Sequence, residues 1–228
     1  MIKTVFLDLD DTIFDFHKAE RLALSSMLIE LGVTPTDELI KRYSEINALQ
    51  WRRLERGEIT RSEVLIERFR LFFLEFGIEQ NPATARQIYE KKLGTGHYFI
   101  DGAEKLLDDL YGKYELYLAS NGTAAVQAGR IKSSGIERYF ERMFISESIG
   151  HNKPAKEFFD ACFSEIDGFD TDCAIIIGDS LSSDILGGRN AGIKTCLFNP
   201  AKKEITGAII PDYEVASLSE IPALLEKI

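Results

Sequence analysis

The sequence contains few cysteines and no long apolar run. The three cysteines, Cys162, Cys173 and Cys196, are far apart and odd in number, and they fit neither a CxxC pair nor a Cys/His zinc pattern. We expect a reducing, cytoplasmic location. No stretch of about 18 apolar residues occurs, and the first residues lack the basic segment and apolar core of a signal peptide. We therefore expect a soluble, unexported protein with no membrane partner.

Basic residues are also in deficit. Lysine and arginine number 27 against 37 aspartates and glutamates, which gives a formal net charge of -10. Such a surface repels polyanions, so no nucleic-acid polymer is expected as a partner, although local groups can still hold a small anion. Repeats, low-complexity tracts and flexible linkers are absent as well. What the chain does have is 228 residues, 45% of them hydrophobic, enough for one core and a smaller second one.

Short runs of β-branched and aliphatic residues recur at 4–8, 114–120, 173–179 and 194–198, with a weaker run at 143–146. Their near-continuous apolarity is typical of strands buried on both faces of a parallel sheet. Helical patterns lie between them, at 101–113, where Asp101 and Glu104 have capping-box spacing, and at 123–135 and 156–166. This alternation predicts an α/β fold with a doubly wound, Rossmann-like parallel sheet and right-handed crossovers.

Residues 15–98 have a different, helical pattern. A first helix is expected at 17–31, and a second should begin with Thr34 at its N-cap and Pro35 at N1. Thr60 and Glu63 have capping-box spacing before a third, and Asn81-Pro82 opens a fourth. We interpret 15–98 as a helical bundle inserted as a cap into an α/β core domain formed by 1–14 and 99–228, with room for a small ligand between the two.

Polar residues follow the predicted strands at the edge where ligands bind in open α/β sheets. Strand alternation tends to send Asp8 and Asp10, which end the first strand, to the same side. The remaining strand-end residues are Ser120, Asn121 and Gly122 after the second strand, and Asp179 and Asp184 after the strand at 173–179.

Lys153 precedes Pro154 in a segment between two strands. If Pro154 occupies N1 of the following helix, Lys153 falls at the N-cap, where lysine is unfavourable. A role other than capping is therefore indicated.

These groups suit phosphoryl transfer. Four carboxylates near one lysine imply a divalent cation, and all-oxygen ligands without a His or Cys cluster favour Mg²⁺. A carboxylate beside such a metal can attack phosphorus to give an aspartyl-phosphate, while a second carboxyl protonates the leaving oxygen and then activates water. Lys153, the Ser120 hydroxyl and backbone N–H groups near Asn121 and Gly122 would neutralise the phosphoryl oxygens.

Each residue also has an ordinary structural explanation. An aspartate after a strand is most often a turn former or a helix cap, a single lysine is usually a solvated charge, and Ser-Asn-Gly is usually a turn. The combination of four strand-end signals in one chain order favours a catalytic site.

In these motifs the sequence resembles the haloacid dehalogenase-like hydrolase superfamily. Its DxDxT motif corresponds to Asp8 through Thr12, its second motif to Ser120, its third to Lys153 and its GDxxxxD motif to Gly178 through Asp184. The resemblance implies Asp8 as nucleophile, Asp10 as general acid/base, and Mg²⁺ held by Asp8, Asp179 and the Asp10 carbonyl, with Asp184 as a further ligand or support. It also implies substrate contacts from Thr12, Ser120, Asn121, Gly122 and Lys153.

Asp10 separates the reactions known in that superfamily. A halide leaving group needs no proton, and the 2-haloacid dehalogenases accordingly lack the second aspartate. The alkoxide that leaves a phosphate ester does need a proton. Phosphatase is therefore favoured over dehalogenase. Phosphomutases carry both aspartates, so this motif does not separate them from phosphatases.

A closer resemblance covers 43–69, 145–154 and 177–200, which look like the corresponding stretches of YjjG-type pyrimidine 5′-nucleotidases, except that Gln50 precedes Trp51 where leucine is expected. It implies hydrolysis of nucleoside monophosphates such as UMP, dUMP or TMP, which are small-molecule phosphate esters. We expect the protein to be a monomer or a small homo-oligomer.

The cap residues that select the substrate are less defined. Candidates for stacking on a base are Trp51, Tyr43, Phe14 and Phe16, with core packing favoured for Tyr43 and for the phenylalanines, and candidates for polar contacts are Arg52, Arg53 and Arg61. The loop at 55–59 is a further candidate.

Three other functions stay open. They are a phosphatase for phosphoglycolate or a sugar phosphate, a receiver-type signalling domain, which the cap and GDSLSSD disfavour, and a non-catalytic interaction protein, which the intact motifs disfavour.

Overall fold

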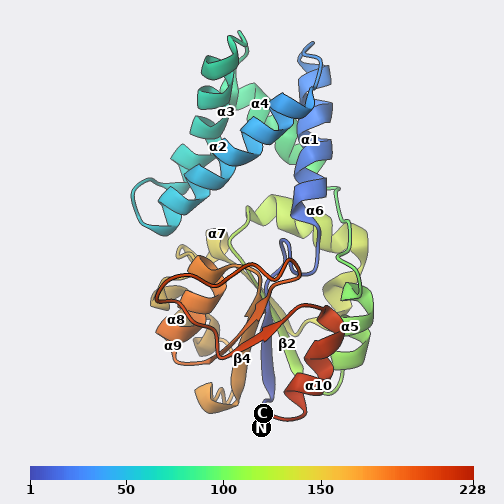
Figure 1. The fold of residues 1–228 in the computed structure, drawn as a ribbon, viewed down its shortest axis with the longest axis vertical. Helices are drawn as coiled ribbons and strands as arrows, with labels where there is room; N and C mark the ends of the chain where they lie inside the picture. Colours follow the sequence, from blue (N-terminus) through green and yellow to red (C-terminus); the bar gives the residue numbers. More distant parts are fainter. The chain divides into compact units, whose positions relative to one another are not determined.

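A computed structural model describes residues 1–228, which form two compact units. A core unit comprises Met1–Phe16 and His97–Ile228, and a cap unit comprises His17–Gly96 (Figure 1). Each boundary lies two residues from the position expected from sequence. None of the helices combines the length and apolarity needed to cross a bilayer.

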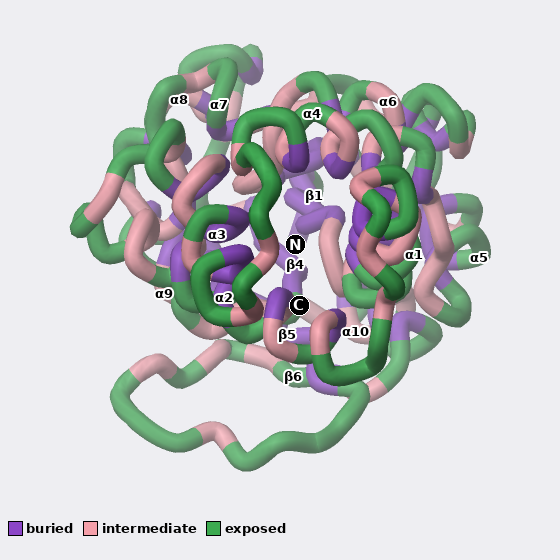
Figure 2. The backbone as a smooth tube through the Cα atoms, turned by 90° about the horizontal axis from the view of Figure 1, so that it is seen from above, coloured by how far each residue is buried: buried purple, intermediate pink, exposed green.

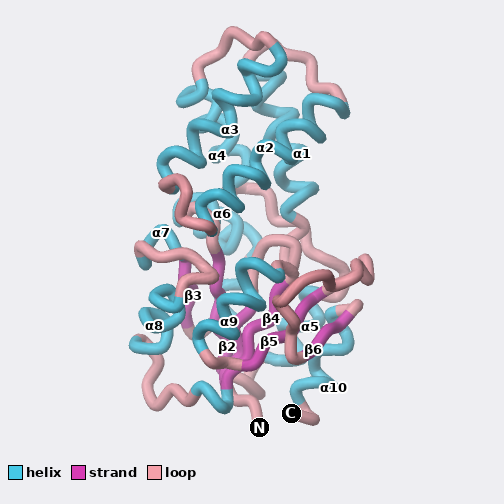
Figure 3. The backbone as a smooth tube through the Cα atoms, turned by 60° about the vertical axis from the view of Figure 1, so that its left-hand side comes forward, coloured by secondary structure: helices cyan, strands magenta, loops and turns pink.

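The core unit contains a six-stranded parallel sheet in the order β3-β2-β1-β4-β5-β6 (Figure 3). The predicted α/β fold is confirmed, and five of the strands lie where the apolar runs placed them. The sixth, β6, was not predicted, because it is a three-residue edge strand with only one buried side chain. The strands are β1 (Thr4–Leu7), β2 (Glu115–Ser120), β3 (Arg142–Ile145), β4 (Ala174–Gly178), β5 (Lys194–Phe198) and β6 (Tyr213–Val215).

Alternate residues of each strand enter two separate cores. On β1, Val5 and Leu7 pack into one core with α5 (Ala103–Leu110), α6 (Ala124–Ser134) and α10 (Ile221–Leu225). Phe6 packs into the other with α8 (Lys156–Ser164) and α9 (Leu186–Ala191). The central strands are therefore buried on both faces, as the purple β1 and β4 in Figure 2 show. Short helical elements complete the unit: α7 (Ser146–Ile149), η1 (Ile136–Tyr139), η2 (Thr171–Cys173), η3 (Leu181–Ile185) and η4 (Leu218–Glu220).

Two helix starts in the core differ from expectation. The predicted capping box of Asp101 and Glu104 is wrong, because Gly102 occupies the N-cap of α5 with φ 82° and no side chain caps the helix. Helix α8 begins at Lys156 with Ala155 at its N-cap, so Pro154 is not at N1 and Lys153 is not at a cap position. The two residues before Ala155 form a separate connection, which leaves Lys153 free to point inward.

The cap unit consists of the four predicted helices, which are α1 (Phe16–Glu30), α2 (Asp37–Glu55), α3 (Arg61–Phe76) and α4 (Pro82–Leu93). Thr60 and Glu63 form the predicted capping box, and Asn81 caps α4. Helix α2 begins two residues later than expected, because Thr36 rather than Thr34 caps it by accepting a hydrogen bond from the Leu39 N–H at 3.2 Å.

Aromatic side chains form the centre of the cap unit. Tyr43 lies 5.3 Å from Phe69, 5.4 Å from Phe72 and 5.6 Å from Tyr89 between ring centroids, and all four are fully buried. Because each aromatic side chain removes a large apolar area from water, this cluster accounts for much of the unit's stability.

Candidate active site

The site is built around Asp8, the residue that follows β1. Its N–H donates to the Ile177 carbonyl at 3.0 Å, which continues the pairing with β4 and turns the carboxyl group to the C-terminal edge of the sheet. The Thr12 hydroxyl donates to Asp8 Oδ2 at 3.4 Å. Burial raises the pKa of Asp8 to about 7; Lys153 opposes this shift, whereas the charges of Asp184 and Asp10 add to it.

Lys153 lies beside Asp8 and is 1% exposed. Its Nζ donates to Asp8 Oδ1 at 2.7 Å, to Asp184 Oδ1 at 2.6 Å and to the Ala119 carbonyl at 2.5 Å. Burial alone would lower the pKa of this ammonium group, but the two carboxylates outweigh it and raise the pKa above its ordinary value. All three protons of a charged lysine are thus used, and Lys153 is fixed as a cation between two acids.

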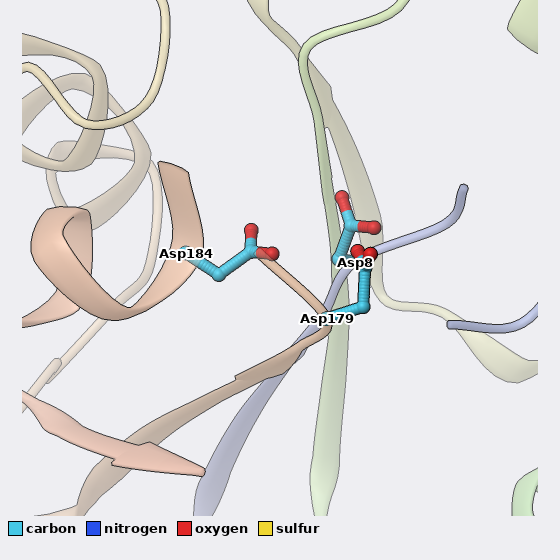
Figure 4. Close-up of side chains that lie close together, drawn as sticks. All are labelled: Asp8, Asp179 and Asp184. Atoms are coloured by element: carbon cyan, nitrogen blue, oxygen red, sulfur yellow. The ribbon is translucent and has the colours of Figure 1, made fainter. Parts of the chain in front are cut away.

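Asp8, Asp179 and Asp184 form a carboxylate cluster in which ligand atoms from the three residues lie within 4.8 Å of one another. Figure 4 shows Asp8 and Asp179 extending from neighbouring strand ends and Asp184 approaching from the following helical turn. That turn, η3, is π-helical, and the Ser180 N–H donates to Asp184 Oδ2 at 3.1 Å. A Cβ on Gly178 would overlap the Asp184 carboxylate, so glycine leaves the space that this side chain occupies.

Asp179 carries the least shielded carboxylate of the cluster. It is exposed to solvent, yet the protein atoms around its carboxyl group and the charges of Asp8 and Asp184 raise its pKa well above the ordinary value. Three mutually repelling carboxylates against one lysine leave negative charge that an added cation would neutralise.

The residues after β2 support this cluster in different ways. Asn121 holds the Lys153 backbone at both ends, because its Nδ2 donates to the Lys153 carbonyl and its Oδ1 accepts from the Lys153 N–H, each at 2.8 Å. The Ser120 hydroxyl oxygen accepts from the Gly122 N–H at 3.1 Å and from Gln127 Nε2 at 2.9 Å. With both lone pairs of Ser120 engaged, its hydroxyl hydrogen is the group that can reach a phosphoryl oxygen.

The Asp10 carboxyl group contacts two side chains of α6. Its Oδ2 accepts from Gln127 Nε2 at 2.7 Å, and its Oδ1 pairs with Arg130 Nη1. Sequence reasoning did not identify Gln127 or Arg130. The available signal was their position: they lie on the same helical face as Ile131, where polar side chains are unexpected.

The candidates for substrate selection occupy different environments. Tyr43 and Phe14 are fully buried, whereas Trp51 is partly exposed on α2. The Trp51 indole N–H donates to Asn47 Oδ1 at 3.1 Å, and the Arg61 guanidinium lies 5.4 Å from the centre of its ring. Tyr43 is therefore core, as expected, whereas Trp51 and Phe16 are the aromatic candidates with accessible surface.

The fold and these side chains define an α/β enzyme with an acidic cluster and one buried lysine at the carboxyl ends of parallel strands. Residues 5–198 match the family model described as haloacid dehalogenase-like hydrolase. The chain belongs to this family, and the resemblance seen in its motifs is confirmed.

Relatives span essentially the whole chain. The HAD-hydrolase YfnB of Bacillus subtilis is 40% identical over 98% of this chain and 95% of its own. A crystal structure of YfnB bound to magnesium superposes with a TM-score of 0.94 at 39% identity, covering 98% of each chain. The pyrimidine 5′-nucleotidase PynA of Streptococcus pneumoniae is 38% identical over 99% of this chain and 95% of its own. The pyrimidine 5′-nucleotidase YjjG of Escherichia coli is 31% identical over 98% and 97%. The expectation of a phosphoric monoester hydrolase is confirmed by this kinship.

Proposed function

We propose that the protein is a Mg²⁺-dependent phosphatase that hydrolyses pyrimidine nucleoside 5′-monophosphates through an acyl phosphate on Asp8, an aspartyl-phosphate. The observation that carries this proposal is the placement of Asp8, whose carboxyl group is bonded to Lys153 and lies in the cluster with Asp179 and Asp184. A carboxylate held beside cationic groups is a competent nucleophile toward phosphorus.

The carboxylate cluster fits a divalent cation by its chemistry. All of its donors are oxygens, and Lys153 balances only part of their charge. Asp8 and Asp179 would hold Mg²⁺ with the Asp10 carbonyl, and Asp184 would act as a further ligand or support. The bound ion would supply positive charge to the phosphoryl oxygens. That the YfnB crystal structure contains magnesium supports this choice of metal.

The steps follow from the side chains. A carboxylate oxygen of Asp8 attacks phosphorus and the bond from phosphorus to the ester oxygen breaks, while Asp10 gives its proton to that oxygen. Lys153 and the Ser120 hydroxyl stabilise charge on the phosphoryl group. Asp10, now a carboxylate, takes a proton from water as this water attacks phosphorus, which releases phosphate and restores both aspartates.

We propose that the unit at 17–96 acts as the cap and selects the substrate. The support is the kinship with PynA and YjjG, both pyrimidine 5′-nucleotidases, and the partial exposure of Trp51, a side chain of a type that can stack on a base. Such substrates belong to the cytoplasm, and the three cysteines are all unpaired, in keeping with that location.

The test is a panel of pyrimidine and purine monophosphates, phosphoglycolate and sugar phosphates, assayed for phosphate release with Mg²⁺ and with EDTA. We expect the highest kcat/KM for UMP, dUMP or TMP and no turnover in EDTA. A preference for phosphoglycolate or a sugar phosphate would contradict the substrate, whereas full activity in EDTA would contradict the metal.

A further inference from the structure

We propose that Gln127 and Arg130 are positioning residues that hold the Asp10 carboxyl group for proton transfer to the leaving group. The inference rests on the proposed function, because it concerns the step in which Asp10 protonates the ester oxygen. Neither residue belongs to the sequence motifs that identify the site.

The contacts account for both oxygens of Asp10. Gln127 Nε2 donates to Oδ2 at 2.7 Å, and Arg130 Nη1 pairs with Oδ1. Arg130 Nη1 also donates to Gln127 Oε1 at 3.0 Å, which joins the two donors to each other. Both are 1% exposed, whereas the side chain of Asp10 keeps 27% of its surface exposed. The donors are thus locked inside the protein, and the carboxyl group they hold faces accessible space.

The position of Gln127 is itself fixed by neighbouring groups. Its Nε2 donates to the Ser120 hydroxyl at 2.9 Å as well as to Asp10, so one amide group aligns the acid/base with a phosphate-binding hydroxyl. A Cβ on Gly122 would overlap the Gln127 amide. Glycine in the Ser-Asn-Gly motif therefore leaves the space that this amide occupies.

Arg130 is fixed on its other side by an aromatic ring. Its guanidinium lies 5.1 Å from the centre of the fully buried Phe14 ring, which itself packs edge-on against Phe99 at 5.1 Å. A planar guanidinium group that contacts a carboxylate, an amide and an aromatic ring loses little conformational freedom for each hydrogen bond that it forms, which suits a residue that holds Asp10 in a fixed position. Burying a polar pair of this kind is costly for stability alone, and the geometry points to its use in orienting Asp10.

A positioning role and a purely structural role predict different results. Protonation by a general acid matters most for a strongly basic leaving group and least for a weakly basic one. If the Asp10 carboxyl group is no longer held in position, hydrolysis of phenyl phosphate, whose phenolate is the more basic leaving group, should therefore slow far more than hydrolysis of 4-nitrophenyl phosphate. A general loosening of the fold slows both alike. Because kcat/KM ends at the first irreversible step, it reports transfer to Asp8 and excludes the later hydrolysis.

The variant to measure is Gln127→Leu, which keeps the side-chain volume and removes both donated hydrogen bonds. We expect kcat/KM for phenyl phosphate to fall about 10-fold or more, part of the 10²- to 10⁴-fold that general acid catalysis contributes, and that for 4-nitrophenyl phosphate to fall less than about 3-fold. Val126→Ala on the same helix is the matched control. Val126 is buried, so this variant loses stability but keeps the ratio of the two rates.

Two further variants complete the test. Arg130→Met removes the charge and keeps apolar contact with Phe14, and Arg130→Lys restores the charge; we expect the same selective loss in the first and partial recovery in the second. If Gln127→Leu does not fold, the comparison of Arg130→Met with Arg130→Lys tests the positioning role. In the background of Asp10→Asn, Gln127→Leu should cause no further selective loss, since its effect passes through Asp10.

Equal losses for the two aryl esters, or a selective loss that adds fully to that of Asp10→Asn, would overturn the inference. A wild-type protein that hydrolyses neither ester would instead contradict the proposed phosphatase, and the inference with it. An active wild type with unselective variants would leave the phosphatase intact and refute only the positioning role.

Discussion

Replacing Lys153 by methionine should destabilise the core unit strongly. The buried Nζ holds the carboxylates of Asp8 and Asp184 at 2.7 and 2.6 Å, and methionine leaves both acids without their counter-charge. Removing one partner of a buried ion pair costs about 3 to 5 kcal/mol. For a chain of this length, this loss corresponds to a fall in Tm of about 6 to 20 °C.

The assay is urea unfolding in EDTA followed by far-UV circular dichroism, since the only tryptophan, Trp51, lies in the cap unit and does not report on the core unit. The double variant Lys153→Met/Asp8→Asn is the control, because removing one acid relieves the unpaired charge and should recover part of the loss. A loss below about 1 kcal/mol, or no recovery in the double variant, would refute the view that Lys153 is the counter-charge of the cluster.

Three further predictions follow from the same contacts. Mg²⁺ at 100 times its Kd should stabilise the protein by about 2.7 kcal/mol in a thermal shift assay, and Asp179→Asn should remove most of that gain; an unchanged shift in the variant would exclude Asp179 as a ligand. Gly178→Ala should displace the Asp184 carboxylate and weaken the apparent Mg²⁺ affinity about 10-fold or more by titration of activity, whereas unaltered affinity would contradict the close approach. Burial raises the pKa of Glu20, so its contribution to cap stability is present at low pH and is lost as pH rises through the raised value. Glu20→Gln should flatten this pH dependence of the free energy of unfolding, measured by urea unfolding followed by Trp51 fluorescence at pH 5 and 8. The same change in unfolding free energy between the two pH values in both proteins would contradict the prediction.

The parts of the fold that sequence predicted are those with strong local signals. The apolar runs at 4–8 and 173–179 correspond to central strands buried on both faces, where hydrophobicity is nearly continuous. Thr60 and Asn81 each begin a helix as their side-chain chemistry indicates. The short edge strand β6 gave no such signal, because its three residues bury only Val215.

Lys153 shows where local reasoning was insufficient. Its interpretation as a residue at an N-cap position assumed that Pro154 opens a helix. In the structure α8 begins at Lys156, and the Lys153 side chain instead donates hydrogen bonds to Asp8 and Asp184. The sequence identified it as unusual, and tertiary contacts supplied the reason.

The candidate site divides in a similar way. The proximity of the residues at strand ends could be predicted from the sequence, because parallel strands align their carboxyl ends at one edge of the sheet. The part that Gln127 and Arg130 play in the site could not be predicted, since both lie in the middle of α6. Their only signal in the sequence is that they are polar side chains on the buried face of this helix. The contact of the Asn121 side-chain amide with the Lys153 backbone could not be predicted either, because the two residues are 32 positions apart.

The most direct test of the account is to trap the phosphorylated enzyme. 4-Nitrophenyl phosphate labelled in its phosphate is mixed with the Asp10→Asn variant and Mg²⁺, quenched in acid within milliseconds to seconds, and the labelled peptide is mapped by mass spectrometry. We predict label on Asp8 approaching one phosphate per chain, because the weakly basic leaving group departs without the acid, whereas the variant lacks the base that activates water for the second step. Turnover by the wild type with no phosphate trapped on Asp8 in either protein, together with full activity of Asp8→Asn, would contradict the mechanism.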